Sequence, residues 1–454
     1  MSEEKVTPIE RIIDQKGISW KNFLQFYLVI AALFLVMFTM RSTVTIFQVF
    51  VPDMSYSFNV SEGTIATLFT IYNLSAAVVS LIIGPLADKL GFKVMIFSGM
   101  FIFASAVTIS TFTTEFWMMA SSQTLAGIGA AFFGPANIAF AGDYFPKERR
   151  TSAIGVIMSS FYVGSIVAVP INSYIADLLD WRWGIRIMGL FSFFVFIVVI
   201  FAIPCLKKRK SKSVSEIDEE KIQEFEKNKA QDLKKTLEID DSIHDEKSYF
   251  QRMGIVLSNK YAIGTFFITL FQRGGLFAMT TLLSTWLVKK FNINTTKIGL
   301  IFMGAGVAAL VSNTLFSWIA GKIGKRKVIL IGTGLTTIWI GIFPLISPIL
   351  SVAIFNIILL NFFGGISMGS YNTFVTEVSE HSKGTTLAIN NTFGQISQAA
   401  TVALLGKLIY DFTGEYIYCG FAAMGIYIVC FILMFIFIRP KIIDERNKLT
   451  NFKQ

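Results

Sequence analysis

Acidic and histidine side chains are missing from the centres of the long apolar segments of this sequence, and cysteine is rare throughout it. The 454 residues include 30 Asp or Glu, 2 His and 3 Cys. Cys205, Cys419 and Cys430 lie in or beside apolar segments without metal-ligand spacing, so we interpret them as small core residues. No nucleophile lies beside a base within an apolar segment. These absences predict no metal site, no cofactor and no enzymatic activity.

Long apolar runs dominate what is present. Hydrophobic residues make up 53% of the sequence and charged residues only 15%, and the mean hydropathy is +0.61. Runs of about 20 residues are long enough to cross the hydrocarbon layer of a bilayer as helices. We therefore predict an all-α, multi-pass membrane protein. Its twelve transmembrane helices are expected at about residues 24–51, 62–84, 94–112, 117–141, 152–176, 184–205, 262–287, 297–320, 328–346, 350–376, 386–409 and 416–438.

Polar segments divide these helices into two groups of six. The expected parts are a cytoplasmic N-terminal segment, a first bundle, a cytoplasmic linker, a second bundle and a cytoplasmic tail, at residues 1–22, 23–205, 206–258, 259–438 and 439–454. The first part is polar and has no small-residue cleavage site, so no cleavable signal peptide is predicted. The linker is rich in charge and poor in aromatic residues, which is typical of a solvated, partly helical segment.

Basic residues indicate the orientation and the partners. Clusters such as Lys147, Arg149 and Arg150 fall in the loops that share one side of the membrane with the N-terminus. Because cytoplasmic loops carry an excess of Lys and Arg, both termini are predicted in the cytoplasm, most simply at the inner (plasma) membrane. The net charge of +10 comes from these loops and predicts no nucleic-acid partner. We expect a monomer that contacts membrane lipid and a small-molecule substrate.

The two halves of the chain repeat each other. FNVSEGTIATLF begins at Phe58 and FNINTTKIGLIF begins at Phe291, and the difference between these two residue numbers is here named the repeat offset. Ala87 and Ala320 in the next matching segments differ by the same offset, and Asn137 and Asn372 differ by nearly the same offset. An offset held this closely over several segments indicates two parallel copies of one six-helix unit.

The segment Gly84-Pro85-Leu86-Ala87-Asp88-Lys89-Leu90-Gly91-Phe92-Lys93 resembles the cytoplasmic helix 2–3 motif of the major facilitator superfamily. GIGAAFFGPANIAFAGDYFPKERR and DWRWGIRIMG also resemble that superfamily, loosely nearest its anion–cation symporter and spinster-like members. The resemblance implies two pseudo-symmetric six-helix bundles and a gate at this motif. The gating residues it implies are Gly84, Asp88, Lys89, Gly91 and Lys93, with Gly321 standing where the second half would repeat Asp88.

Two arginines lie near the middle of predicted helices 1 and 7. Arg41 and Arg273 differ by nearly the repeat offset, so they occupy equivalent positions in the repeat. A guanidinium in hydrocarbon requires water, a counter-charge or a bound anion, and neither helix has an acidic residue nearby. An arginine pair there resembles that of organophosphate-exchanging members, where it binds the anionic group of the substrate. The alternative is that each arginine caps a broken helix or extends to the interface.

Neutral polar side chains near these helices are candidates for orienting a ligand. Amides and phenols supply hydrogen bonds without adding charge, although each of them can equally join two helices. The candidates with Arg41 and Arg273 for the substrate site are Asn137, Asn372, Gln48, Tyr72, Gln272, Tyr371, Asn391 and Gln395, and the wider set includes Asn73, Tyr162 and Gln398.

These features predict a secondary active or facilitative transporter of a small organic anion, either an organophosphate or a carboxylate. The missing carboxylates favour anion exchange or uniport over proton symport, unless the substrate brings its own proton. The alternatives are a transporter of an amino acid, peptide, carboxylate siderophore or lysolipid. A nutrient sensor that keeps this fold without transport is a further alternative.

Overall fold

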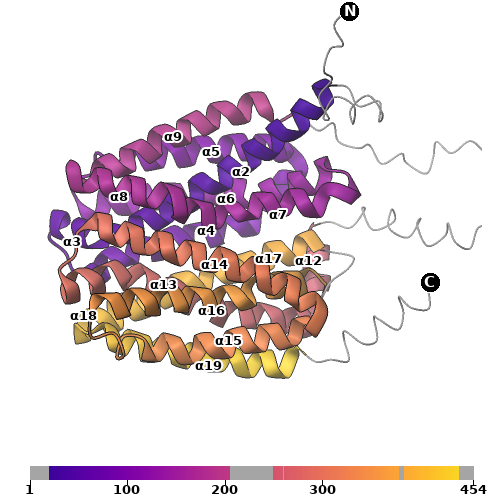
Figure 1. The fold of residues 1–454 in the computed structure, drawn as a ribbon. Helices are drawn as coiled ribbons and strands as arrows, with labels where there is room; N and C mark the ends of the chain where they lie inside the picture. The colour runs from indigo at the N-terminus through magenta and orange to yellow at the C-terminus, as the bar shows by residue number, and fades with distance from the viewer. Residues whose placement is uncertain (1–19, 205–248, 259, 378–382, 439–454) are drawn as a thin grey trace, which may run out of the picture.

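The structure, a computed structural model, describes residues 20–204, 249–258, 260–377 and 383–438. Within these ranges the chain is helical and has no strand, as the apolar sequence predicts. The helices form two bundles that lie side by side, one from each half of the chain (Figure 1).

The helices of the first bundle run back and forth along its long axis. They are α2 (Trp20–Val49), α4 (Glu62–Leu90), α5 (Phe92–Ser110), α6 (Phe116–Tyr144), the continuous α7 (Lys147–Val163), η1 (Gly164–Ala168) and α8 (Val169–Leu178), and α9 (Trp181–Ala202). The η1 segment is a π-helical turn that interrupts the fifth long helix. The sequence predicts one regular helix there, at residues 152–176, so this interruption is a departure from the prediction.

The second bundle repeats this arrangement after the short helix α12 (Tyr249–Ser258). Its helices are α13 (Lys260–Phe291), α14 (Thr295–Ile323), α15 (Lys325–Ile342), α16 (Leu350–Glu377), the continuous α17 (Lys383–Val402), η5 (Ala403–Tyr410) and α18 (Asp411–Thr413), and α19 (Tyr416–Phe437). A π-helical segment thus interrupts the eleventh long helix as well as the fifth. Both interrupted helices pack against the opposite bundle, α8 on α14 and η5 on α4.

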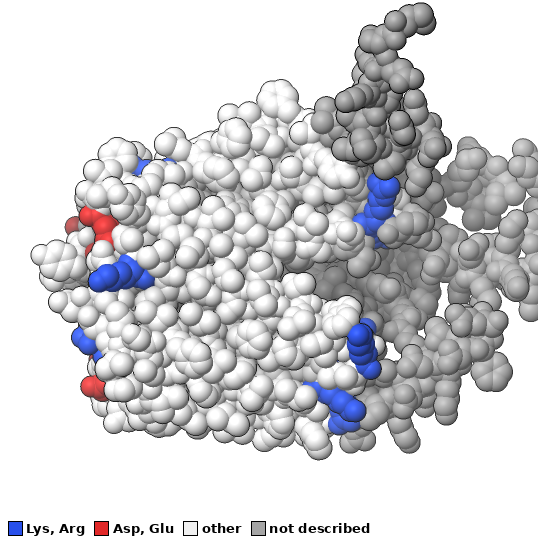
Figure 2. Space-filling model, viewed as in Figure 1, with Lys and Arg blue, Asp and Glu red and all other residues white. Residues whose placement is uncertain are grey.

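Ten helices in the described part of the chain are long and apolar enough to cross a membrane. The continuous α7, η1 and α8 segments make up one of these spans. The two remaining long helices differ for visible reasons: α15 begins with Lys325, Arg326 and Lys327, and α17 carries amide and hydroxyl side chains along its length. With them the bundles have the predicted twelve long helices. Figure 2 shows charged side chains at the two ends of the molecule and an uncharged band between them.

The ends of the molecule can be told apart by the short helices. At one end, here named the α3 end, lie α18 and the short helix α3 (Val51–Phe58) (Figure 1). At the opposite end, the linker end, α9 finishes and α12 lies. The predicted helices at 24–51 and 62–84 leave a loop at residues 52–61, whereas the structure forms α3 over most of it. Pro52 stands at the first turn of α3, where a missing N–H costs nothing.

The backbone confirms the internal repeat. Gly91 joins α4 to α5 at φ 84°, and Gly324 joins α14 to α15 at φ 95°. Both angles lie where a side chain would strain the backbone, which explains glycine at two positions separated by the repeat offset. The predicted copies of one unit therefore share a turn as well as a sequence pattern.

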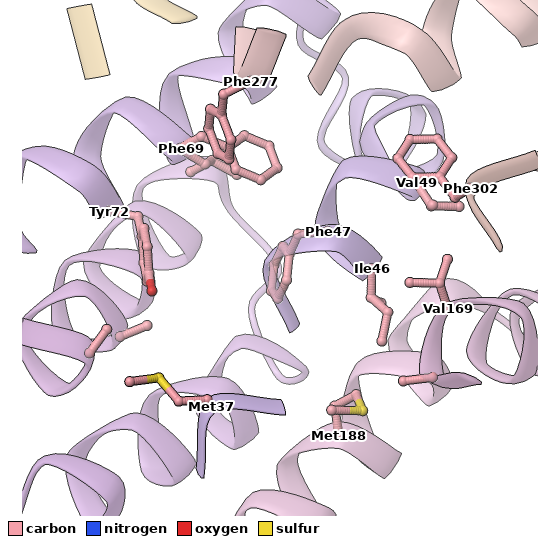
Figure 3. Close-up of a cluster of buried hydrophobic side chains, with 14 of the residues drawn as sticks. Met37, Ile46, Phe47, Val49, Phe69, Tyr72, Val169, Met188, Phe277 and Phe302 are labelled. Carbon is pink, nitrogen blue, oxygen red and sulfur yellow. The ribbon is translucent and has the colours of Figure 1, made fainter. Parts of the chain in front are cut away.

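The bundles share a buried apolar core toward the α3 end. Phe69 of α4 meets Phe277 of α13 edge to face, with ring centroids 6.1 Å apart, so the two bundles touch through aromatic rings (Figure 3). Ile46 and Phe47 of α2 and Phe302 of α14 belong to the same buried cluster and are labelled in the same view. This contact joins the two bundles on the α3 side.

Candidate functional site

Helices α2 and α13 meet close to the axis that relates the two halves. Gln48 Nε2 donates to Thr281 Oγ1 at 3.0 Å and to Thr280 Oγ1 at 3.5 Å. Thr281 differs from Gln48 by the repeat offset and Thr280 by nearly that offset, so Gln48 contacts the positions equivalent to its own. Equivalent residues can meet only near the axis of the repeat. Ser284 Oγ strengthens the contact by donating to the Gln48 carbonyl oxygen at 2.6 Å.

Arg41 and Arg273 lie about two turns along these helices from that contact, toward the linker end. Each side chain is surrounded by protein yet keeps part of its surface accessible. The two guanidinium groups are close enough to interact electrostatically, and the interaction is repulsive. The structure therefore brings the predicted pair to one place between the bundles.

Matching helix crossings hold the two arginines in position. A Cβ atom on Gly164 of η1 would lie 2.6 Å from Ser42 Oγ, the residue after Arg41. In the second bundle the glycine stands on the helix that carries the arginine. A Cβ atom on Gly274 of α13, the residue after Arg273, would lie 2.6 Å from the Ser397 carbonyl oxygen of α17. Gly164 and Ser397 differ by the repeat offset, and Ser42 and Gly274 differ by nearly that offset. A small residue at each crossing lets the helix backbones approach closely beside each arginine.

The Arg273 side chain has partners on α17. Its Nη1 donates to Asn391 Oδ1 at 3.2 Å, so the predicted candidate Asn391 contacts it directly. Its chain also lies against Gly394, where an added Cβ atom would come 2.6 Å from Arg273 Cδ. Both residues belong to α17, the polar helix of the second bundle.

Arg41 lacks this support. In the first half, the positions that precede Asn391 and Gly394 by the repeat offset are Met158 and Phe161, which offer no comparable hydrogen-bond acceptor in their side chains. No hydrogen bond or ion pair joins the Arg41 guanidinium to another residue in the described ranges. Tyr72 and Tyr162 lie within electrostatic range of it. In Figure 3 the Tyr72 hydroxyl points away from the Phe69–Phe277 contact.

The remaining polar candidates divide into buried and accessible groups. Tyr371 is fully buried and its hydroxyl donates to the Thr265 carbonyl oxygen at 2.7 Å. Asn137 Nδ2 donates to the Leu33 carbonyl oxygen at 2.9 Å, and Gln272 Nε2 donates to Ser367 Oγ at 3.4 Å. The members with accessible surface are Asn372, Asn391, Gln395, Gln398 and Tyr162, whereas Gln48, Tyr72, Asn73, Asn137, Gln272 and Tyr371 are buried.

Two buried candidates retain an unused acceptor. Asn137 Oδ1 and Gln272 Oε1 are buried and have no hydrogen-bond partner in the described structure. A buried acceptor without a donor is unfavourable by about 1–3 kcal/mol, so these two oxygens are suited to a donor supplied by a ligand or by water. Asn137 therefore remains a candidate, although its amide nitrogen already donates a hydrogen bond to the Leu33 carbonyl oxygen.

The predicted gating motif lies at the linker end. Gly84, Asp88 and Lys89 belong to α4, but their side chains lie outside the described part of the structure. Lys93 Nζ donates to the Ile200 carbonyl oxygen at 3.3 Å, within its own bundle. Gly91 forms the turn after α4, and Gly321 has open space where a Cβ atom would stand.

The sequence pattern does not predict the contacts between bundles at the α3 end. Lys289 Nζ of α13 lies 3.0 Å from Glu62 Oε1 of α4, and Asp177 and Asp411 each bond the start of a helix in the opposite bundle. The only available signal was that Asp177 and Asp411 differ by nearly the repeat offset. Farther in, Thr70 Oγ1 donates to the Ala399 carbonyl oxygen at 3.1 Å. These layers close the α3 side of the arginine pair.

The chain matches known proteins over most of its length. The sequence model described as Major Facilitator Superfamily matches residues 33–402 and 265–452. The sphingosine-1-phosphate transporter SPNS2 of Xenopus tropicalis is 27% identical over 34% of this chain and 31% of its own length. The sialic acid transporter NanX of Escherichia coli is 24% identical over 58% of this chain and 56% of its own length. The matches thus span less than two thirds of these two relatives.

A solved structure shares the fold. A bacterial homolog of the human lysosomal transporter spinster, in an inward-facing and unoccupied conformation, superposes with a TM-score of 0.67. The superposition covers 91% of this chain and 96% of that one at 13% identity. This likeness confirms the predicted arrangement of twelve helices in two bundles.

Proposed function

This chain belongs to the Major Facilitator Superfamily and is an integral, multi-pass membrane protein, and we propose that it transports a small organic anion by alternating access between its two bundles. The substrate class is an organophosphate or a carboxylate. Arg41 and Arg273 bind its anionic group, and the accessible amides of α17 contribute neutral hydrogen bonds.

The repeated, partly accessible arginine pair carries this proposal. Two guanidinium groups repel each other in a site of low dielectric, so the pair is electrostatically unfavourable without a counter-charge. In the described helices the acidic residues lie near helix ends, as Glu62, Asp143, Asp177 and Asp411 do. None of these can neutralise a pair in the middle of α2 and α13. A bound anion supplies the missing charge and can accept bidentate hydrogen bonds from each guanidinium.

The asymmetry of the pair suggests how the anion is bound. Arg273 is held by Asn391, so its hydrogen-bond donors are already oriented when a ligand arrives. Arg41 has no such anchor in the described structure and can adjust to ligands of different shape. One fixed and one adjustable arginine can bind a phosphate or carboxylate while the rest of the molecule varies.

The names of two relatives support an anionic substrate. SPNS2 is named as a transporter of sphingosine-1-phosphate, and NanX as a transporter of sialic acid. One ligand carries a phosphate group and the other a carboxylate, the two groups that arginine binds best. The lipid-like ligand of SPNS2 keeps the predicted lysolipid alternative within the proposal.

We further propose that the protein lies in the inner (plasma) membrane with its linker end facing the cytoplasm, and that it acts as a monomer. The basic residues Lys93, Arg149 and Lys322 lie at this end of the described helices, where the positive-inside rule expects them. Since the α3 side is closed, the arginine site would then be reached from the cytoplasm.

Flux through proteoliposomes tests this function. Purified protein is reconstituted and assayed with glycerol 3-phosphate, sialic acid and sphingosine-1-phosphate, each against its uncharged counterpart, glycerol, sialic acid methyl ester or an N-acylated sphingosine without phosphate. We expect flux of an anion and none of its uncharged counterpart. Arg41→Gln and Arg273→Gln should each abolish the flux, whereas Lys322→Gln, which removes an exposed cation at the linker end, should not.

Two results would contradict the proposal. Undiminished anion flux in both arginine variants would remove the arginines from the site. Anion binding to the wild type without any flux would instead support the nutrient-sensor alternative.

A further inference from the structure

Asp177 lies near the C-terminus of α8 in the first bundle. Its carboxylate accepts hydrogen bonds from the start of α14 in the second bundle. Its Oδ2 accepts hydrogen bonds from the Thr296 backbone N–H at 2.7 Å and from Asn294 Nδ2 at 2.8 Å. Its Oδ1 accepts one from the Thr295 backbone N–H at 3.1 Å. The first N–H groups of a helix have no partner within the helix and carry partial positive charge, so a carboxylate stabilises them.

Asp411 of the second bundle likewise accepts hydrogen bonds from the start of α4 in the first bundle. It stands where the eleventh long helix ends, in the second bundle, and its Oδ1 accepts a hydrogen bond from the Gly63 backbone N–H at 3.0 Å. Its Oδ2 accepts one from Ser61 Oγ, the N-cap residue of α4 in the first bundle, at 2.6 Å. Asp177 and Asp411 differ by nearly the repeat offset, so the two contacts are copies of one another.

The backbones beside these carboxylates also approach in matching pairs. A Cβ atom on Gly299 of α14 would lie 2.6 Å from Ser173 Cβ of α8. A Cβ atom on Gly406 of η5 would lie 2.9 Å from Ala66 Cβ of α4. Gly299 and Ala66 differ by the repeat offset, as do Gly406 and Ser173. Each carboxylate is therefore seated above a close helix crossing between the bundles.

We propose that Asp177 and Asp411 are paired latches that hold the α3 end shut and release together when the bundles rock. Each latch joins the end of one helix to the start of another across the boundary between bundles. Opening the α3 end must break every one of these hydrogen bonds, and water then solvates the carboxylates and the helix starts. The latches thus set the balance between the closed and open forms of this end, whatever substrate the arginine site binds.

The surroundings of the two latches differ. Asp411 is also 2.9 Å from Lys407 Nζ of its own helix, and Lys407 in turn donates to Thr64 Oγ1 of α4 at 2.7 Å. Asp177 has no basic neighbour of this kind in the described structure, and Asp53 shares its partner Thr295. The Asp177 latch consequently depends on the helix start alone, and loss of its carboxylate should have the larger effect.

Distances between spin labels across the α3 end test the proposal. Tyr56 of α3 and Phe412 of α18 are 92% and 90% exposed, and they belong to different bundles. Labels are attached to Tyr56→Cys and Phe412→Cys in full-length protein in lipid nanodiscs, with Cys205, Cys419 and Cys430 replaced by Ser. A second label pair at Leu90 and Ile323, both about half exposed, reports on the linker end.

We expect Asp177→Ala and Asp411→Ala each to raise the ratio of long to short distances at the α3 end, with the larger rise, about fivefold for a helix-start carboxylate, in Asp177→Ala. The double variant should multiply the two effects, and the Leu90–Ile323 distance should shorten in step. Asn in place of Asp should give an intermediate ratio, because an amide oxygen still accepts a hydrogen bond.

The matched controls are acidic residues at the same end that are exposed to solvent. Glu115 and Glu415 are both exposed, one in each bundle. Glu115→Ala and Glu415→Ala should leave both distance distributions unchanged. Wild-type distributions in a correctly folded double latch variant would overturn the proposal, as would equal effects from the control variants.

Discussion

Acidification should favour the closed form of the α3 end through Asp53. Its carboxyl group lies in α3, outside the membrane-spanning helices, and Thr295 of the opposite bundle donates to it at 3.4 Å. Burial raises the pKa of Asp53 from 3.8 to about 6, and the nearby Asp177 and Asp180 carboxylates contribute to the rise, while the Thr295 hydrogen bond opposes it. Opening the α3 end exposes this carboxyl group to water, so its pKa should fall toward 3.8.

The sign and size of the effect follow from this difference. The closed form binds the proton more tightly, so protonation stabilises it. The stabilisation is complete below pH 3.8 and is lost as the pH rises through about 6. Between pH 7 and pH 5 the closed form should gain about 1.3 kcal/mol, which is roughly a ninefold change in the ratio of closed to open.

The label pair at Tyr56 and Phe412 measures this ratio directly. In wild-type protein the short-distance fraction should grow on moving from pH 7 to pH 5. In Asp53→Asn, which keeps a neutral side chain at every pH, that dependence should disappear. Glu115→Gln, at an exposed acidic residue of the same end, should retain it. A pH dependence that is equal in wild type and Asp53→Asn would refute the assignment to Asp53.

Two further substitutions test the geometry of the arginine site. Asn391→Ala removes the 3.2 Å hydrogen bond to Arg273 and should weaken anion binding about fivefold to tenfold, as judged by the concentration dependence of anion-induced thermal stabilisation. Its repeat counterpart Met158→Ala should change that concentration dependence little, and equal losses would show that Asn391 does not orient Arg273. Gly274→Ala places a Cβ atom 2.6 Å from the Ser397 carbonyl oxygen, so it should destabilise the fold by roughly 1–3 kcal/mol and lower the unfolding temperature in detergent. Gly425→Ala has open space around its Cβ atom and should unfold near the wild-type temperature. A wild-type unfolding temperature for Gly274→Ala would show that α13 and α17 can move apart without loss of stability.

The helices and the repeat could be predicted from the sequence because each depends on local pattern. Apolar runs of membrane-spanning length fix the helices, and a constant offset between matched segments reveals the duplication. The same offset predicts that Arg41 and Arg273 belong to one site. The interruptions at η1 and η5 were missed, because a π-helical turn changes the hydrogen-bond register without changing the apolar pattern.

Side-chain partners could not be predicted, since they depend on helix rotation and crossing. Tyr371 is an apt ligand residue by composition, yet its hydroxyl is bonded to the Thr265 carbonyl oxygen. Gln48 likewise joins α2 to α13 near the repeat axis. The anchor of Arg273 at Asn391 has no counterpart beside Arg41 in the described helices, and repeat symmetry alone would have predicted one.

We infer that a bound anion completes the charge of the Arg41–Arg273 pair. Thermal unfolding of purified protein with inorganic phosphate, glycerol 3-phosphate, sialic acid and sphingosine-1-phosphate tests it most directly, since a ligand of the native state raises the unfolding temperature. We predict that at least one of these anions stabilises the wild type, that its uncharged counterpart does not, and that Arg41→Gln and Arg273→Gln, though folded, lose the effect. Equal stabilisation by an anion in wild type and in both variants would contradict the account.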